Sequence, residues 1–125
     1  ITRNDNTHKA SAGAFIARYV FPDGELIGSG TIVTAVEGAG LEFQHHENIR
    51  AHYAKTLAGG CHNLEANWDR AVELVGPGRA RVWRLYMAGS ANGFRDGGLG
   101  IHQVLGVVAG PDGASGMPPT RAGFV

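Results

Sequence analysis

A tyrosine in the stretch "NIRAHYAKTL" (48–57) is the first residue whose position suggests chemistry. The stretch lies between a strand-like run and a helix-like run. A small polar residue at such a junction would be enough to cap the helix. Tyr53 stands there instead, between His52 and Ala54. Because a phenol can donate a hydrogen bond to an anion without adding charge, Tyr53 is either a packed ring or a donor in a site.

A second group of side chains has the spacing of one helix face. In the stretch "RVWRLYMAGSANGF" the residues four apart are Tyr86, Ser90 and Phe94, with Trp83 and Met87 alongside. Spacing alone favours an ordinary stripe of core side chains. The small residues Gly, Ala and Gly at positions 89, 91 and 93 leave room beside the large ones. One wall of an apolar ligand channel is therefore the alternative.

Metal and redox chemistry find little support in the residue pattern. His45 and His46 are adjacent in a strand-like run, so their side chains point to opposite faces and cannot chelate one ion. We interpret them as a solvated strand end and expect no metal. Cys61 has no CxxC partner and no neighbouring charge that would lower its pKa, which favours a packed thiol.

The glycines of "GELIGSGTIV" invite comparison with a dinucleotide-binding loop. That motif needs a third glycine and a preceding strand, whereas position 33 is Val and a Pro-Asp-Gly turn comes before. We therefore interpret Gly28 and Gly30 as the start of a helix, capped by Ser29 or Thr31.

Length and charge exclude several classes of protein. The chain has 125 residues, with 11 basic and 11 acidic side chains and a formal net charge of zero. This balance argues against a nucleic-acid-binding protein. No apolar run approaches the ~20 residues that span a bilayer, and a single cysteine favours a reducing compartment such as the cytoplasm. Because the chain starts at Ile1 and not at Met, we expect it to be a piece of a longer protein.

Hydrophobic periodicity divides the chain into helices and strands. The predicted helices cover about 29–38, 62–75 and 80–95, and the predicted strands, antiparallel neighbours, cover about 41–46 and 99–108. The first strand alternates, with Leu41, Phe43 and His45 on one face. Two or three strands bury little alone, so we expect part of an α/β domain. The Gly- and Pro-rich tail, 109–125, is expected to be flexible.

At this level of detail the chain resembles one protein family. In unbroken order over 1–108 it is similar to the last third of proteins of the cyclopropane-fatty-acyl-phospholipid synthase and mycolic acid synthase family. Within that family it most resembles actinobacterial fatty-acid methyltransferases. The stretches that carry the resemblance are "FIARYVFPDGELIGSGTIV", "ENIRAHYAKTL", "NLEANWDRAVELVG", "RVWRLYMAGSANGF" and "LGIHQVLGVV". The resemblance implies the C-terminal part of a Rossmann-like, class I S-adenosylmethionine-dependent methyltransferase, without the cofactor-binding N-terminal part.

The resemblance also implies a reaction and a role for two residues. The reaction is transfer of a methyl(ene) carbon to the cis double bond of a phospholipid-linked acyl chain, with bicarbonate as the base. Tyr53 stands at the tyrosine of the family's "HYxxTL" motif, which implies a catalytic residue that contacts the bicarbonate. Ile1 matches a position whose backbone also contacts it.

The helix-face residues acquire a role in the same way. Tyr86, Ser90 and Phe94 match positions that line the acyl channel, although the family often has Cys where this chain has Ser90. We therefore expect Trp83, Tyr86 and Phe94 to face an apolar channel rather than a filled core, and these four residues to bind substrate.

Cofactors and partners follow from the resemblance alone. S-adenosylmethionine and bicarbonate would both be bound mainly by the part of the protein upstream of Ile1, and this chain by itself would be inactive. The implied partners are phospholipid acyl chains, a membrane surface contacted peripherally from the cytoplasm, and the upstream part of the same chain; a homodimer is compatible, and nucleic acid is not expected. The alternative is a non-catalytic lipid-binding or dimerisation module derived from the same fold.

Overall fold

The computed structural model describes residues 1–3, 10–11 and 13–120, and within them short strands alternate with helices. In chain order the elements are β1 (Thr2–Arg3), β2 (Ala10–Ser11), α1 (Ala14–Tyr19), β3 (Glu25–Gly28), α2 (Ser29–Gly38), β4 (Glu42–Asn48), α3 (Arg50–Ala66), α4 (Trp68–Arg95), β5 (Leu99–Gly100) and β6 (His102–Val107). None of the helices in these ranges is long and apolar enough to cross a membrane.

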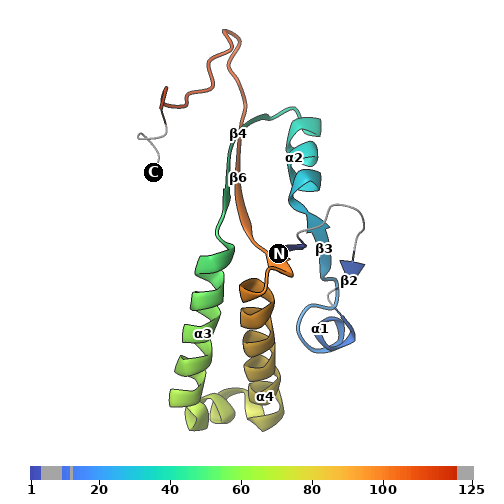
Figure 1. Ribbon diagram of the computed structural model, residues 1–125, viewed down its shortest axis with the longest axis vertical. Coiled ribbons are helices and arrows are strands. Elements are labelled where there is room, and N and C mark those ends of the chain that lie inside the picture. The colour runs from blue at the N-terminus through green and yellow to red at the C-terminus, as the bar shows by residue number, and fades with distance from the viewer. Residues whose placement is uncertain (4–9, 12, 121–125) are drawn as a thin grey trace.

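The strands form two hydrogen-bonded groups (Figure 1). One has the order β2-β3-β1-β5, in which β1 is parallel to β3 and antiparallel to β5. The other is the antiparallel pair β4–β6, which confirms the predicted neighbours. The predicted strand 99–108 is divided at Ile101 into β5 and β6, because β5 pairs with β1 whereas β6 pairs with β4.

A β-bulge in β4 overturns the predicted alternation of that strand. Phe43 pairs with Gly106 and His45 pairs with Leu105, so one extra residue of β4 lies between two consecutive partners on β6. Since successive residues of β6 point to opposite faces, Phe43 and His45 also lie on opposite faces and do not share one, as the sequence had suggested.

Helix α2 ends as predicted but begins differently. Its end is fixed by Gly40, with φ of 78°, and by the hydrogen bond from the Leu41 N–H to the Val36 carbonyl. The N-cap is Gly28, with no side-chain cap bond, so the prediction that Ser29 or Thr31 caps the helix was wrong. Gly28 is also the last residue of β3, so the strand runs directly into the helix.

Helices α3 and α4 form an antiparallel pair whose boundaries differ from those predicted (Figure 1). The predicted helix 62–75 is divided by Asn67, the N-cap of α4, and α3 extends back to Arg50 through the two glycines at 59 and 60. The helix continues there because α3 packs closely on α4: a Cβ at Gly60 would lie 3.1 Å from the Met87 sulfur. The predicted stop at Gly76 is a kink inside α4, where φ is 80°.

Full burial is confined to a small region of the described chain. The buried apolar side chains are Ala80, Ala91 and Phe94, all on α4 after its kink at Gly76, and the buried polar ones are Thr2 of β1 and Ser90 of α4. The packed core therefore lies around the later turns of α4. The described part of the tail, 109–120, contains a turn in which the Gly110 N–H donates to the Ala114 carbonyl (2.9 Å); its flexibility and the boundary at 108 stay predictions, and 121–125 lie outside the described residues.

Gly106 offers a test of how β6 packs under α2. A Cβ there would lie 2.7 Å from Cγ1 of Val36 and 3.3 Å from Cβ of Leu41, neither of which can move freely. We expect Gly106→Ala to lower the free energy of unfolding by about 1–3 kcal/mol, measured by urea denaturation. The control is Gly59→Ala in α3, where nothing lies within 4 Å of the added Cβ and a gain of roughly 0.5–1 kcal/mol is expected. Equal effects of the two changes would contradict the described packing.

Candidate active site

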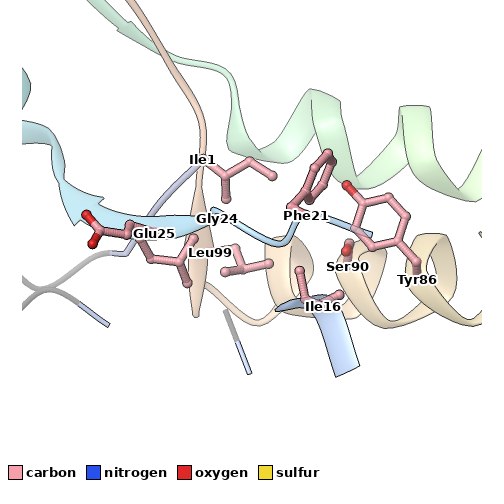
Figure 2. Close-up of a pocket in the computed structure, with 9 residues that line it drawn as sticks. Ile1, Ile16, Phe21, Gly24, Glu25, Tyr86, Ser90 and Leu99 are labelled. Carbon is pink, nitrogen blue, oxygen red and sulfur yellow. The ribbon is translucent and has the colours of Figure 1, made fainter. Parts of the chain in front are cut away.

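An apolar cavity of about 290 Å³ opens where β1, α1, β3, α4 and β5 meet (Figure 2). It is lined by Ile1, Ile16, Phe21, Gly24, Glu25, Leu26, Tyr86, Ser90 and Leu99. The Glu25 carboxylate points away from the other labelled residues in Figure 2. The hydroxyls of Tyr86 and Ser90 are therefore the polar side-chain groups that remain within an otherwise apolar lining.

A second cavity, of about 300 Å³, adjoins the first along α1 and α4. The two cavities share Ile16, Tyr86, Ser90 and Leu99. Leu99 reaches this position because the facing helix residue is Gly93, where a Cβ would lie 2.8 Å from the Leu99 side chain. An elongated apolar ligand could thus extend from one cavity into the other.

Tyr86 stands between the two cavities and is held by other rings. Phe21 and Trp83 each contact it edge-to-face, at centroid distances of 5.7 and 5.4 Å. Burial raises the pKa of Tyr86 above 10.0, a side-chain hydrogen bond with Ser90 partly offsets this, and the nearby Tyr53 raises it further. The phenol is consequently neutral at physiological pH and presents a hydroxyl to the apolar cavity.

Tyr53 approaches the same region from α3. It lies in the first turns of that helix, where its backbone N–H donates to the Ile49 carbonyl (3.0 Å). Its ring contacts Phe94 of α4 at a centroid distance of 5.4 Å and an angle of 60°. Tyr53 is not part of the lining of either cavity, but its effect on the pKa of Tyr86 shows that the two phenols are close enough to interact electrostatically.

The structure brings together some of the predicted site residues and separates others. Ile1, Tyr86 and Ser90 share one cavity. Phe94 is 0% exposed and is part of the lining of neither of these two cavities; its ring packs against that of Tyr53. Trp83 contacts the Tyr86 ring from outside the lining. The roles of these residues in binding substrate and of Tyr53 and Ile1 in binding bicarbonate stay predictions.

Comparison with known proteins places the chain in a family. The family model described as mycolic acid cyclopropane synthetase matches residues 1–104. The chain belongs to this family. It is 50% identical over 118 residues to the "Probable fatty acid methyltransferase" of Mycobacterium tuberculosis, and 46% identical over 110 residues to a "Probable fatty acid methyltransferase" of Pseudomonas putida. These matches cover 94% and 88% of this chain but 28% of each relative, so the chain spans under a third of their length.

Solved structures of the family show the same arrangement of elements. The mycolic acid cyclopropane synthase CmaA1, complexed with SAH and CTAB, matches with a TM-score of 0.68 and 28% identity, over 72% of this chain and 32% of that protein. The cyclopropane synthase MmaA2 from Mycobacterium tuberculosis also has a TM-score of 0.68, at 23% identity. The α/β fold is thus that of part of a class I S-adenosylmethionine-dependent methyltransferase, as the sequence predicted.

In this member of the cyclopropane synthase family, the sequence analysis did not identify the residues that line the cavity opposite α4. Ile16 of α1 and Phe21 after it line the first cavity, together with Leu26 and Leu99. The signal that could have found the first two is the apolar run "AFIARYVF", which ends at a Pro-Asp-Gly turn closed by the Gly24 N–H and the Phe21 carbonyl (3.1 Å). That turn folds the run back towards α4.

The structure revises the interpretation of two groups of residues, the glycines before α2 and the histidines of β4. Contrary to the prediction, a strand does stand before α2: β3 ends at Gly28 and runs directly into the helix without an intervening glycine loop. His46 is exposed as predicted, yet its Nε2 lies 2.6 Å from Nδ1 of His102 across the β4–β6 pair. Burial and the nearby His46 lower the pKa of His102. In the described ranges no three potential metal ligands cluster.

The hydrogen bond between Ser90 and Tyr86 can be tested by titration. We expect Ser90→Ala to raise the pKa of Tyr86 further, because the bond that stabilises the phenolate is removed while the burial that destabilises it remains. The measurement is the ultraviolet absorbance of phenolate against pH, with Tyr86→Phe used to assign the signal and Ser29→Ala on α2 as the control. A pKa of Tyr86 that stays unchanged or falls would contradict the described contact.

Proposed function

We propose that this chain is the C-terminal part of an S-adenosylmethionine-dependent methyltransferase that transfers a methyl(ene) carbon to the cis double bond of phospholipid-linked acyl chains. The observation that carries the proposal is the apolar cavity formed by Ile1, Tyr86 and Ser90, in a chain whose residues 1–104 match the mycolic acid cyclopropane synthetase family. The fatty-acid methyltransferase names of two relatives support the class of reaction.

The cavity suits the substrate class for a physical reason. An alkene is a weak nucleophile, so the site must align it with the methyl donor and exclude water that would react with the developing cation. Ile16, Phe21 and Leu99 provide apolar walls, and the neutral Tyr86 and Ser90 hydroxyls add no charge that an acyl chain would have to desolvate. The complex of a solved relative with CTAB, a lipid-like detergent, supports the same assignment.

Bicarbonate fits the residues of this chain in part. The phenol of Tyr53 is a neutral donor on α3, and Thr2, beside Ile1, has a buried hydroxyl that finds no hydrogen-bond partner among the described residues. When bound, the anion would supply a base of suitable strength, and Tyr53 with the Ile1 backbone would hold it. S-adenosylmethionine supplies the methyl group; we expect it to be held mainly by residues upstream of this chain.

The cellular setting follows from the proposed substrate. Acyl chains of phospholipids lie in a membrane, so the enzyme would work from the cytoplasm in peripheral contact with the bilayer. The first cavity suits such a contact because two of its lining residues, Ile1 and Phe21, remain exposed. A homodimer is compatible with the proposal and is not required by it.

The role of Tyr53 can be tested in the full-length enzyme. Tyr53→Phe removes one hydrogen-bond donor to an anion and keeps the ring that packs on Phe94. Such a loss costs about 1.5–3 kcal/mol, which corresponds to a roughly ten- to hundredfold drop in turnover. Turnover is measured across a titration of bicarbonate.

The matched control for this change is Tyr19→Phe, in α1, whose ring is exposed and contacts Phe15. We expect the control to keep full turnover. Rates of Tyr53→Phe that equal those of the unchanged enzyme at every bicarbonate concentration would show that Tyr53 is only a packed ring.

The acyl-binding role of the cavity can be tested at Ser90. Ser90→Phe fills the space shared by both cavities, so we expect loss of activity on long acyl substrates with nearly unchanged affinity for S-adenosylmethionine, measured by calorimetry. Ala88→Phe, on the exposed side of the same helix, is the control. Equal loss of both functions would indicate misfolding, and lipid binding without turnover in the unchanged protein would favour a non-catalytic lipid-binding module.

A further inference from the structure

Arg50, the first residue of α3, reaches across to the end of α4. Its Nη1 donates hydrogen bonds to the carbonyl oxygens of Phe94 and of Arg95, the latter at 3.1 Å. Both carbonyls belong to the last turn of α4, where helical hydrogen bonding leaves carbonyls unpaired and the helix dipole is negative. The guanidinium of Arg50 therefore stabilises the end of α4 in two ways: it donates hydrogen bonds to the free carbonyls, and its positive charge lies at the negative end of the helix dipole.

Two further hydrogen bonds, both donated by backbone N–H groups, strengthen the same junction. The Arg50 N–H donates to Oδ1 of the Asn48 side chain (3.0 Å), which fixes the start of α3, and the Ile49 N–H donates to the Ile101 carbonyl (3.1 Å). The second bond ties the passage from β4 into α3 to the passage from β5 into β6. In Figure 1 these ends of the two helices lie side by side next to the β4–β6 pair.

The same junction determines where Tyr53 lies. Tyr53 follows Arg50 by three residues, so the two side chains share one face of α3. The Tyr53 ring contacts the ring of Phe94, whose carbonyl accepts the bond from Arg50. Ser90 and Tyr86 lie one and two turns earlier on α4, so a shift of α3 at Arg50 would move Tyr53 along the wall that carries the cavity hydroxyls.

Apolar burial alone does not hold α3 in place. None of its residues is fully buried, and its leucines, Leu57 and Leu64, are only half-buried, so the apolar area that resists a slide or rotation of α3 along α4 is less than a fully buried face would provide. The contact between Gly60 and Met87 lies about two turns along α3 from Tyr53. The hydrogen bonds that Arg50 and its neighbour Ile49 make to other elements lie closer to Tyr53, at the start of the helix.

We infer that Arg50 is a positioning residue, which fixes Tyr53 of α3 against the Phe94, Ser90 and Tyr86 face of α4. The inference rests on the proposed function for its effect on turnover. The positional effect itself is independent of any activity. Lysine cannot replace Arg50 fully, because its ammonium is a strongly hydrated point charge on a flexible stem, whereas the planar guanidinium holds the two Nη1 hydrogens in fixed directions.

A double-mutant cycle in the full-length enzyme tests the coupling. The four proteins are the unchanged enzyme, Arg50→Met, Tyr53→Phe and the double variant. We expect each single change to lower kcat about tenfold or more, and the double variant to be no slower than the slower single one, because a misplaced Tyr53 has no hydroxyl function left to lose. The KM for S-adenosylmethionine should stay within about twofold, and Arg50→Lys should recover part of kcat.

The matched control is Arg95→Met at the same helix end. The Arg95 guanidinium donates to Oδ1 of Asn92 within its own helix (2.7 Å), and its backbone carbonyl survives the change, so kcat should be unchanged. Losses that multiply in the double variant would show that Arg50 acts independently of Tyr53 and would overturn the inference.

Hydrogen–deuterium exchange separates this inference from the proposed function. In Arg50→Met the amides of 50–57 should exchange about tenfold or more faster, while those of 80–91 keep their protection. If Tyr53→Phe leaves turnover unchanged, the catalytic role of Tyr53 fails, but faster exchange over 50–57 still supports positioning. Unchanged exchange over 50–57 overturns the inference whatever the activity shows.

Discussion

The packing of Phe94 is the constraint on which the rest of this chain depends. Its ring is fully withdrawn from solvent and contacts Tyr53 of α3, while its carbonyl accepts a hydrogen bond from Arg50. One residue earlier, Gly93 admits Leu99 of β5 against α4. The antiparallel helix pair and the strands that follow it are therefore joined at one turn of α4, and the cavity lies along the preceding turns of the same helix.

The chemistry of the cavity depends on keeping its polar groups neutral. Burial favours the protonated phenol of Tyr86 over the phenolate, and Ser90 offsets this only in part and adds no charge. An apolar substrate then meets walls that cost little to desolvate. A carboxylate at position 90 would change this balance, because its charge would need a partner that the lining residues do not supply.

Elements governed by local signals could be predicted from the sequence, and those governed by distant contacts could not. Helix α2 ends at residue 38, as predicted, because the positive φ that stops it, at Gly40, is a local requirement that glycine meets. The start of α3 was missed because its continuation through Gly60 depends on the approach of Met87, a residue on another helix. In the same way, spacing identified the face shared by Tyr86 and Ser90, but only packing could show that Phe94 is covered.

The bulge in β4 limits how the length of this chain can vary. Because Gln44 is the extra residue between Phe43 and His45, its deletion would remove the bulge and leave both neighbours on their present faces, opposite Gly106 and Leu105. Deletion of a residue that is itself paired, such as His46, would instead shift everything on one side of it by one position along β6 and exchange its two faces. The residues that lead into α3 would then rotate by half a turn, so the helix that carries Tyr53 tolerates a shorter β4 at Gln44 better than at the paired positions after it.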